Sequence, residues 1–225
     1  MIIPEQTHSL NVGILTENQR SFPDTDALIT RLVGEEIGVR TADCVPVVLY
    51  AADIKAVAAV HAGWKGSEGG ILSITIEKLK EMGSRPENIY VKFGPAICGD
   101  CYEVDSSLAE RFIDKGFADC ITYPNGPDGK PHIDLARVNA ERCVDAKIPS
   151  QNITMSDYCT KHSTDNAGNP IFHSWRRSPG TTLRNFTTIQ LLPYTSLKSN
   201  DETSSADKWS EVIINIIGTS GNPME

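Results

Sequence analysis

Long apolar runs are missing from this sequence. The longest, Val45–Ala52 and Val212–Ile217, are too short to cross a bilayer as a helix. The first residues, MIIPEQTHSLNVG, also lack the basic stretch and the long apolar segment of a secretory signal. We therefore expect a soluble, cytoplasmic protein with no membrane partner.

Basic residues are in deficit. The chain has 21 Lys and Arg against 29 Asp and Glu, which gives a formal net charge of -8 at pH 7. An acidic surface repels the phosphates of a nucleic acid, so we expect no nucleic-acid partner. A small phosphate-bearing ligand remains compatible with this charge, because a few local Arg and Lys side chains are enough to bind it. The oligomeric state cannot be inferred from these properties.

Cysteine is scarce, with six residues in a chain of 225 that is too long to need disulfides for stability. Without an export signal we expect reduced thiols, which serve as ligands or nucleophiles or are simply buried. Cys98 and Cys101 form a C-x-x-C pair, which is typical of a redox pair or of half a zinc site. No second C-x-x-C completes four ligands, so we favour a structural or pocket-lining role for this pair.

Short strand patterns alternate with helical patterns along the chain. Val45–Ala52 and Ala56–Ala62 are apolar, β-branched runs separated by three residues, which predicts a tight hairpin of two buried strands. The glycine-rich stretch Gly63–Gly70 leads into a predicted helix over Ile71–Met82, and Gly83 is its expected C-cap. With 40% hydrophobic residues, the length fits one domain with a real core, or one domain plus a tail.

The same patterns continue through the second half. Further elements are predicted as follows: strands at Ile89–Phe93, Ile171–Trp175 and Thr187–Leu192, and helices at Ser106–Lys115 and Asp134–Ala146. In the last helix Asp134 is the expected cap, and Leu135, Val138 and Val144 are expected to face the core.

The composition changes after Pro193. Polar and charged residues dominate Thr195–Lys208, which is typical of a flexible linker. The apolar run Trp209–Ile217 that follows predicts a peripheral strand or helix packed on the domain, or alternatively a partner-binding peptide. We therefore divide the chain into a catalytic domain over residues 1–193 and a polar linker with a C-terminal extension over residues 194–225.

Three residues that commonly bind metals are expected to meet at one sheet edge. Cys44 precedes the first strand of the predicted hairpin and His61 ends the second, so an antiparallel pairing places them side by side. His8 could complete the group from an adjacent strand. Two imidazoles and one thiolate suit zinc and leave a fourth position open, as a catalytic metal requires. The alternative is a hydrogen-bonded core histidine and a buried cysteine, and no short motif such as HxxxH decides between them.

Five sequence blocks resemble those of one protein family. They occur in the family's order and at its usual spacing, and they are DALIT (Asp26–Thr30), RTADCVPVVL (Arg40–Leu49), AVHAGWKG (Ala59–Gly66), FGPAICGDCYEV (Phe93–Val104) and FHSWRR (Phe172–Arg177). Over Ile3 to Leu192 the chain resembles the laccase-domain, or multicopper polyphenol oxidase, proteins. Members of this family are also named peptidoglycan editing factor and purine nucleoside phosphorylase.

This resemblance implies both a fold and an activity. The implied fold is α+β, a single-domain layered sandwich of mixed β-sheet with flanking helices and a metal in a pocket. His8, Cys44 and His61 match the family's zinc-ligand positions. The implied reactions are phosphorolysis of adenosine, inosine and methylthioadenosine, and deamination of adenosine. Relatives carry a further segment before the position of His8, and we expect a chain without it to have an exposed strand edge and a partly unwalled pocket.

Phosphorolysis requires groups that bind phosphate. Arg176 and Arg177 can supply permanently charged, fork-shaped contacts, and in a predicted strand at most one of the two points inward. Arg40 and Lys65 complete the expected phosphate-binding set. The backbone amides of Gly63–Gly70, at a helix N-terminus, are a second candidate anion site.

The remaining candidate residues flank the predicted metal. Cys44 is expected to act in catalysis as well as in metal binding. Asp43 is a candidate proton shuttle in deamination or a partner for a ligating histidine, although a simple turn residue is equally consistent with its position. Trp64 and Tyr102 are candidates for stacking on a purine, or are core residues.

Three other functions remain open. A copper oxidase needs paired histidine motifs such as HxH, and none occurs among the five histidines, which are His8, His61, His132, His162 and His173. A hydrolase that edits peptidoglycan precursors would use Cys44 as nucleophile and His61 as base. The last alternative is an inactive relative that only binds purines. The preferred purine, and whether phosphorolysis or deamination dominates, cannot be inferred from the sequence.

Overall fold

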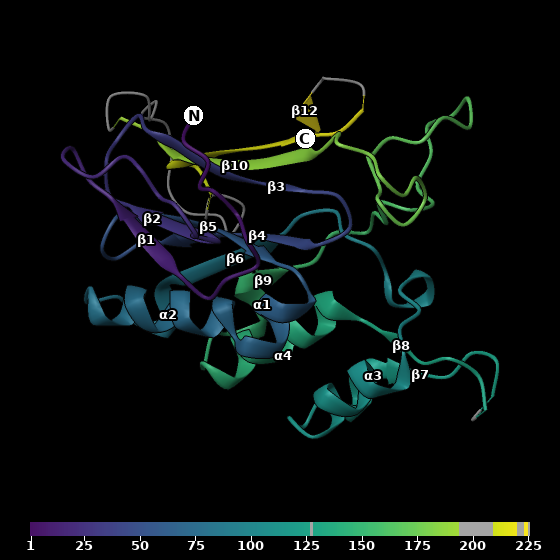
Figure 1. Ribbon diagram of the computed structural model, residues 1–225. Helices are drawn as coiled ribbons and strands as arrows, with labels where there is room; N and C mark the ends of the chain where they lie inside the picture. Colours follow the sequence, from purple (N-terminus) through teal and green to yellow (C-terminus); the bar gives the residue numbers. More distant parts are fainter. Residues whose placement is uncertain (127, 194–208, 220–222, 225) are drawn as a thin grey trace.

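The computed structural model describes residues 1–126, 128–193, 209–219 and 223–224. Three layers are visible in Figure 1: a four-stranded sheet, a six-stranded sheet below it, and helices on the far face of the larger sheet. This arrangement confirms the predicted α+β sandwich with flanking helices. No helix in the described ranges is long and apolar enough to cross a membrane.

The larger sheet is mixed and has the strand order β1-β2-β5-β4-β6-β9. Its strands are β1 (Val12–Leu15), β2 (Ala27–Thr30), β4 (Val45–Ala51), β5 (Ala56–Ala62), β6 (Ile89–Phe93) and β9 (Ile153–Thr154). The β1–β2 and β6–β9 pairs are parallel and the other pairs antiparallel. The predicted hairpin of β4 and β5 is confirmed, with Pro46 opposite His61.

Alternation along β5 decides where His61 points. Ala58 and Val60 belong to the core between this sheet and the helices, whereas Val57 and Ala59 belong to the core between the two sheets. Because side chains alternate between the faces of a strand, His61 shares the face of Val57 and Ala59. The C-terminal end of β5 therefore presents the His61 imidazole on the face of the sheet that lies toward the four-stranded sheet.

The smaller sheet is antiparallel and has the strand order β12-β11-β10-β3. Its strands are β3 (Glu36–Thr41), β10 (Asn185–Leu191), β11 (Val212–Ile217) and β12 (Pro223–Met224), and a separate hairpin joins β7 (Ile121–Thr122) to β8 (His132–Ile133). The apolar run after Trp209 is thus a strand paired with β10. The predicted linker Thr195–Lys208 lies outside the described residues.

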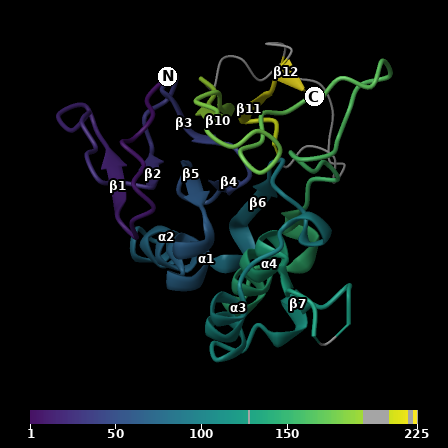
Figure 2. The same ribbon diagram turned by 45° about the vertical axis from the view of Figure 1, so that its right-hand side comes forward.

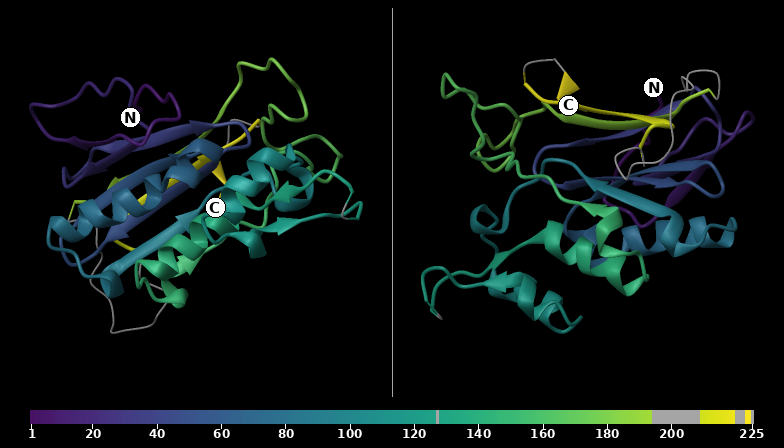
Figure 3. Two further views of the ribbon diagram at one scale, coloured as in Figure 1. Left: turned by 60° about the horizontal axis from the view of Figure 1, so that its bottom comes forward. Right: turned by 180° about the vertical axis from the view of Figure 1, so that it is seen from behind.

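The helices lie on one side of the large sheet. They are α1 (Trp64–Gly69), α2 (Ile71–Glu81), α3 (Ser106–Ile113) and α4 (Leu135–Asp145), with 3-10 turns η1 (Pro86–Asn88), η2 (Gly99–Cys101), η3 (Ala118–Cys120) and η4 (Ser150–Asn152). Figure 3 shows α2 and α4 against the sheet. In Figure 2, α3 and β7 lie below α4, at the end of the molecule away from the four-stranded sheet. The predicted cap of α4 is confirmed, since the Asp134 side chain accepts from the Arg137 N–H.

Two helix predictions need correction. Gly63–Gly70 is largely the helix α1, in which the Ser67 N–H donates to the Gly63 carbonyl over 2.7 Å, so the amides from Ser67 onward are used within the helix. In α4 the expected core residue Val144 is 54% exposed, whereas Cys143 is fully buried. The buried face of α4 includes positions 135, 139 and 143, and residue 144 has rotated out of it.

The prediction of a strand at Ile171–Trp175 is wrong. Residues 155–184, all of them described, contain neither a helix nor a strand. The backbone of His173 is instead bonded to the Asn185 side chain, whose carbonyl accepts from the His173 N–H and whose amide donates to the His173 carbonyl, each over 2.8 Å. Phe172 and Ser174 are buried, so the alternation of this segment reflects packing of a loop.

Candidate metal centre and pocket

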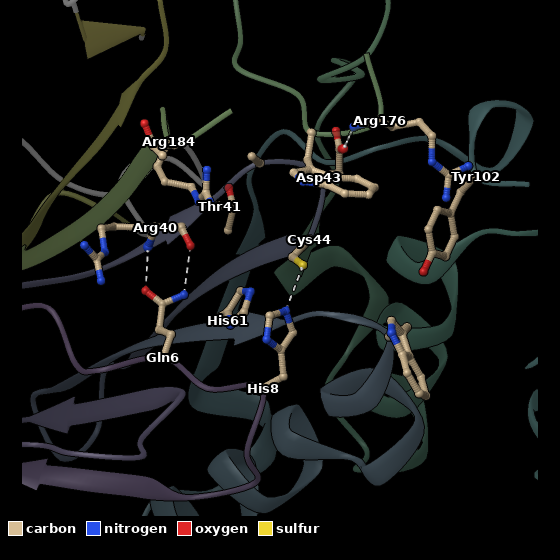
Figure 4. Close-up of a pocket in the computed structure, with 14 residues that line it drawn as sticks. Gln6, His8, Arg40, Thr41, Asp43, Cys44, His61, Tyr102, Arg176 and Arg184 are labelled. Carbon is tan, nitrogen blue, oxygen red and sulfur yellow. Dashed lines mark hydrogen bonds between the residues drawn. The ribbon is translucent and has the colours of Figure 1, made fainter. Parts of the chain in front are cut away.

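The three predicted ligands converge in space. The ligand atoms of His8, Cys44 and His61 all lie within 4.8 Å of one another. Cys44 Sγ is 3.7 Å from His8 Nε2, and the two imidazole rings meet edge to face at 4.8 Å (Figure 4). A tetrahedral zinc site with usual bond lengths has ligand-to-ligand edges of about 3.3–3.6 Å. The donor set and its spacing therefore fit a metal ion with three protein ligands.

His8 is held in a left-handed backbone conformation, with φ of 63°. The N–H groups of Thr7, His8 and Ser9 all donate to the carboxylate of Asp26, over 3.1, 3.1 and 2.6 Å. A non-glycine residue keeps a positive φ only where its surroundings compensate the strain. The buried carboxylate of Asp26 provides that compensation and so positions His8.

Asp26 also orients His61. Its Oδ1 lies 2.6 Å from His61 Nδ1, and the His61 N–H donates to the Asp26 carbonyl across the β2–β5 pairing. Since the carboxylate accepts, Nδ1 carries the proton and Nε2 is left to bind a metal. Burial alone would raise the pKa of Asp26, but hydrogen bonds from His61 and Ser9 lower it to about 2. Asp26 was not among the site residues predicted from the sequence, although it begins one of the family blocks and directly precedes the buried strand β2.

The electrostatics of the cluster favour a thiolate. Burial alone would raise the pKa of Cys44, but hydrogen bonds and charge from His61 and His8 outweigh it and lower the pKa from 9.0 to about 6. Burial would likewise lower the pKa of His61, but Asp26 and Cys44 raise it from 6.5 to about 9. At neutral pH the metal-free site thus pairs a thiolate with an imidazolium, and a thiolate is both the nucleophile and the metal ligand.

Only a glycine fits beside this cluster at position 63. A Cβ atom on Gly63 would lie 2.6 Å from His8 Cδ2 and 3.0 Å from Cys44 Sγ. The start of α1 therefore packs its bare backbone directly against two of the ligands.

A pocket of about 660 Å³ opens in front of the cluster, within the range of about 300–1,000 Å³ typical of small-molecule sites. Its lining residues are Gln6, His8, Arg40, Thr41, Ala42, Asp43, Cys44, His61, Trp64, Tyr102, Trp175, Arg176, Thr182 and Arg184. The candidate stacking residues Trp64 and Tyr102 both line it. Trp175 and Arg184 line it as well, and neither was singled out from the sequence.

Two of the four predicted phosphate-binding residues line the pocket and two do not. Arg40 and Arg176 line the pocket, and the Arg176 guanidinium lies over the Tyr102 ring at 5.0 Å. Arg177 and Lys65 are not among the described residues that line the pocket. Arg177 donates to the carbonyls of Thr160, Lys161 and Phe172, and the exposed Lys65 lies over the Trp64 ring. One arginine of the pair points inward, as expected, although the segment is not a strand.

Asp43 anchors the wall of the pocket. It has a φ of 95°, and one carboxylate oxygen accepts from Thr160 Oγ1 over 2.7 Å. The other accepts from the Arg176 N–H over 2.6 Å (Figure 4). The carboxylate partner of a ligating histidine is Asp26 and not Asp43. The role of Asp43 as a proton shuttle stays a prediction.

Residues 1–192 match the model of the multi-copper polyphenol oxidoreductase laccase family. The chain belongs to this family. Among curated relatives it is 38% identical over 171 residues to adenosine deaminase RL5 from an unknown prokaryotic organism, covering 72% of this chain and 65% of that protein. It is 34% identical over 180 residues to a purine nucleoside phosphorylase of Deinococcus radiodurans, covering 80% and 66%.

Solved structures of similar laccase-family proteins share the fold. The chain superposes on the hypothetical protein YfiH of Bacillus licheniformis with a TM-score of 0.75 at 28% identity, covering 83% of this chain and 72% of that one. For YlmD of Geobacillus stearothermophilus the TM-score is 0.72 at 28% identity, covering 85% and 73%. The chain spans slightly under two thirds of the length of the two curated relatives above.

The sequence blocks that carry the family resemblance surround the pocket. DALIT supplies Asp26, RTADCVPVVL supplies Cys44, AVHAGWKG supplies His61 and FHSWRR supplies Arg176. Blocks far apart in the sequence therefore meet at one site, which is where a common chemistry would be located.

Proposed function

We propose that this chain is a zinc-dependent purine nucleoside phosphorylase that also deaminates adenosine. The observation that carries the proposal is the convergence of His8, Cys44 and His61 at a pocket lined by both aromatic rings and guanidinium groups. The names of the curated relatives, adenosine deaminase and purine nucleoside phosphorylase, support the same substrate class.

The donor set suits zinc, and within the described residues no third imidazole joins it, as a multinuclear copper site would need. Two imidazoles and one thiolate are a three-ligand set of the kind that catalytic zinc uses, and a fourth position stays available for substrate or water. Zinc bound there would supply Lewis-acid polarisation of the group at its free position. Within the described residues, His132 belongs to neither group of side chains whose ligand atoms could hold a metal.

The lining residues can bind both substrates of phosphorolysis. In this reaction a phosphate oxygen bonds to C1 of the ribose while the glycosidic bond breaks, and the base leaves with the electron pair and then takes up a proton. Arg40, Arg176 and Arg184 can hold the phosphate through permanently charged donors. Trp64 and Trp175 supply flat surfaces for the purine.

Tyr102 can stabilise the leaving base. Burial, with a further contribution from the Cys44 thiolate, raises the pKa of Tyr102 to about 12, so its phenol stays protonated at neutral pH. A neutral phenol in the pocket can donate a hydrogen bond to a purine nitrogen as negative charge builds on it. The Arg176 guanidinium over the ring fixes its position.

The test is incubation of the purified chain with adenosine, with and without phosphate, while adenine, inosine and hypoxanthine are resolved. We expect adenine only when phosphate is present, and inosine in both conditions. Removal of the metal with a chelator should abolish both products, and zinc should restore them. Binding of adenosine without conversion by the zinc-loaded chain would contradict the proposal.

A thiol hydrolase is the second candidate, because the pKa of Cys44 is lowered to about 6 beside two imidazoles. Such an enzyme would use Cys44 as nucleophile and would act on peptidoglycan precursors. The two functions respond differently to a chelator, since a thiol hydrolase keeps its activity in the metal-free form. Cys44→Ser should inactivate either enzyme, and Cys120→Ser, a buried cysteine outside the cluster, is the matched control.

A further inference from the structure

A second group of metal-binding side chains lies outside the pocket. The ligand atoms of Cys98, Cys101, Cys159 and His162 all lie within 4.8 Å of one another. None of the four is among the described residues that line the pocket. We propose that these side chains bind a second zinc ion in a closed, structural site.

The spacing and the distances fit a tetrahedral site. Cys98 precedes the turn η2 and Cys101 is its last residue, and Cys159 and His162 are separated by two residues on a second turn. His162 Nδ1 lies 3.4 Å from Cys101 Sγ and 3.9 Å from Cys98 Sγ. Edges of about 3.5–3.8 Å follow from zinc–sulfur and zinc–nitrogen bonds of usual length. Four protein ligands leave no open position, so this site is not a second catalytic centre.

Backbone amides support a thiolate at the centre of the group. The Cys98 N–H donates to Cys159 Sγ over 3.4 Å, and the N–H groups of Lys161 and His162 also bond to this sulfur. Amide donors aimed at a sulfur stabilise its charged form and fix the orientation of a ligand. The sequence contains no second C-x-x-C, and the complementary half is instead the C-x-x-H pair at Cys159 and His162.

The proposed ion would join two segments that build the pocket wall. One is the turn that continues into Tyr102, and the other is the segment 155–184, which has no helix or strand of its own. So long a connection without regular structure is uncommon in a compact domain and needs a restraint. Thr160, next to Cys159, donates to Asp43, and Arg177 donates to the carbonyls of Thr160 and Lys161. A metal here would therefore hold Trp175 and Arg176 in place.

The first experiment counts metal by elemental analysis of the reduced chain after purification without a chelator. We expect two zinc ions per chain, one of which is lost in His61→Ala. A single zinc that disappears in His61→Ala would overturn the proposal, and so would a Cys98–Cys101 or Cys98–Cys159 disulfide in the freshly isolated chain, identified by alkylation and mass spectrometry. Because zinc is counted at each site separately, this result is independent of the proposed nucleoside chemistry.

Variants of His162 test the second site without endangering the fold, because this side chain is exposed. In competition with a zinc chelator, His162→Ala should bind its second zinc at least about tenfold more weakly. Substitution of a residue that only orients a ligand already lowers metal affinity by about that factor, so loss of a ligand should lower it at least as much. His162→Cys, which keeps four ligands, should retain it. His173→Ala, in the same segment but outside both clusters, is the matched control. Equal zinc retention in His162→Ala and the wild type would overturn the proposal.

Cobalt and proteolysis give readouts that do not depend on activity. With cobalt in both sites, the sulfur-to-metal charge-transfer absorption should fall by about a quarter in Cys44→Ser, because one of four thiolates is lost. Loss of the second zinc in His162→Ala should also speed proteolytic cleavage within residues 155–184, because the ion would no longer hold this segment. Loss of most of the charge-transfer absorption in Cys44→Ser would show that the second cluster binds no metal.

Discussion

At the scale of single residues, Asp26 positions two of the three candidate ligands. It bonds His61 Nδ1 and also the backbone amides on both sides of His8, so one buried carboxylate orients two ligands. The grouping of the three candidate ligands could be predicted from the sequence, because the hairpin brings Cys44 and His61 together and the family resemblance adds His8.

Asp26→Asn should weaken zinc binding by about 10–100-fold while the chain stays folded. An amide at this position can donate to His61 Nδ1, which would move the imidazole proton to the nitrogen that must bind the metal. The measurement is a competition titration with a zinc chelator, on protein in which the second cluster is already loaded. Asp24→Asn is the matched control, because Asp24 contacts Thr7 and Asn11 but is not among the partners of His61. Unchanged zinc affinity in Asp26→Asn would contradict the role given to this carboxylate.

Asp26 itself could not be assigned from the sequence. Its bond to His61 exists because β2 pairs with β5, and a pairing between strands 35 residues apart leaves no local signal. The same reason applies to Arg184 and Trp175, which reach the pocket because residues 155–184 fold back against the turn between β3 and β4, where Asp43 bonds Thr160 and Arg176. Side chains brought together by long-range packing are visible only in the folded molecule.

At the scale of elements, the turn between β4 and β5 is fixed by a carboxylate. Asp53 accepts from the Ser84 hydroxyl, the Arg85 N–H and the Asn88 side-chain amide, which ties the turn to the segment before β6. Burial would raise the pKa of Asp53, but these bonds outweigh it and hold the pKa below its ordinary value of 3.8.

Asp53→Asn should lower the free energy of unfolding at pH 7 by about 0.5–1 kcal/mol, a modest value because the turn is exposed. The folded-state pKa is depressed, so the stabilisation is fully present above pH 3.8 and is lost as the pH falls through the lower folded value. Urea unfolding of both proteins at pH 7 and near pH 3 measures this, with the exposed Asp119→Asn as control. A difference between wild type and variant that does not shrink toward pH 3 would contradict the assignment.

The strand β11 contributes a side chain to the core between the two sheets. Val212 is 7% exposed and lies in the core between the two sheets, whereas the next residue, Ile213, is 41% exposed. Val212→Ala should lower the free energy of unfolding by on the order of 2 kcal/mol, because it leaves a cavity. Ile213→Ala, the matched control on the opposite face, should cost about 1 kcal/mol or less. Denaturant unfolding measures both, and equal small effects would mean that β11 does not contribute to the core.

Elements with strong periodicity could be predicted, and those defined by tertiary contacts could not. β4, β5, β6 and α2 were predicted to within one residue, since their apolar patterns are unambiguous. Ile171–Trp175 alternates like a strand, but its backbone bonds go to Asn185 and to the loop, which no local pattern reveals. The glycine-rich stretch Gly63–Gly70 was expected only to lead into the following helix, although most of it is the helix α1.

At the scale of the whole molecule, the pocket forms where the two sheets and the segment 155–184 meet. The six-stranded sheet supplies His61 and the turn with Cys44, the four-stranded sheet supplies Arg40, and the long segment supplies Trp175 and Arg176. The layered fold could be predicted from the family resemblance. The division at residue 193 stays a prediction, although β11 pairs with β10 of the main body.

The central claim is that His8, Cys44 and His61 hold one metal ion that leaves a position open toward the pocket. A crystal structure of the active, zinc-loaded chain, with anomalous scattering recorded at the zinc edge, tests it directly. The account predicts an anomalous peak about 2.3 Å from Cys44 Sγ and about 2.0–2.1 Å from Nε2 of each imidazole, with the fourth position facing the pocket. An active protein without an anomalous peak between these three side chains would contradict the account.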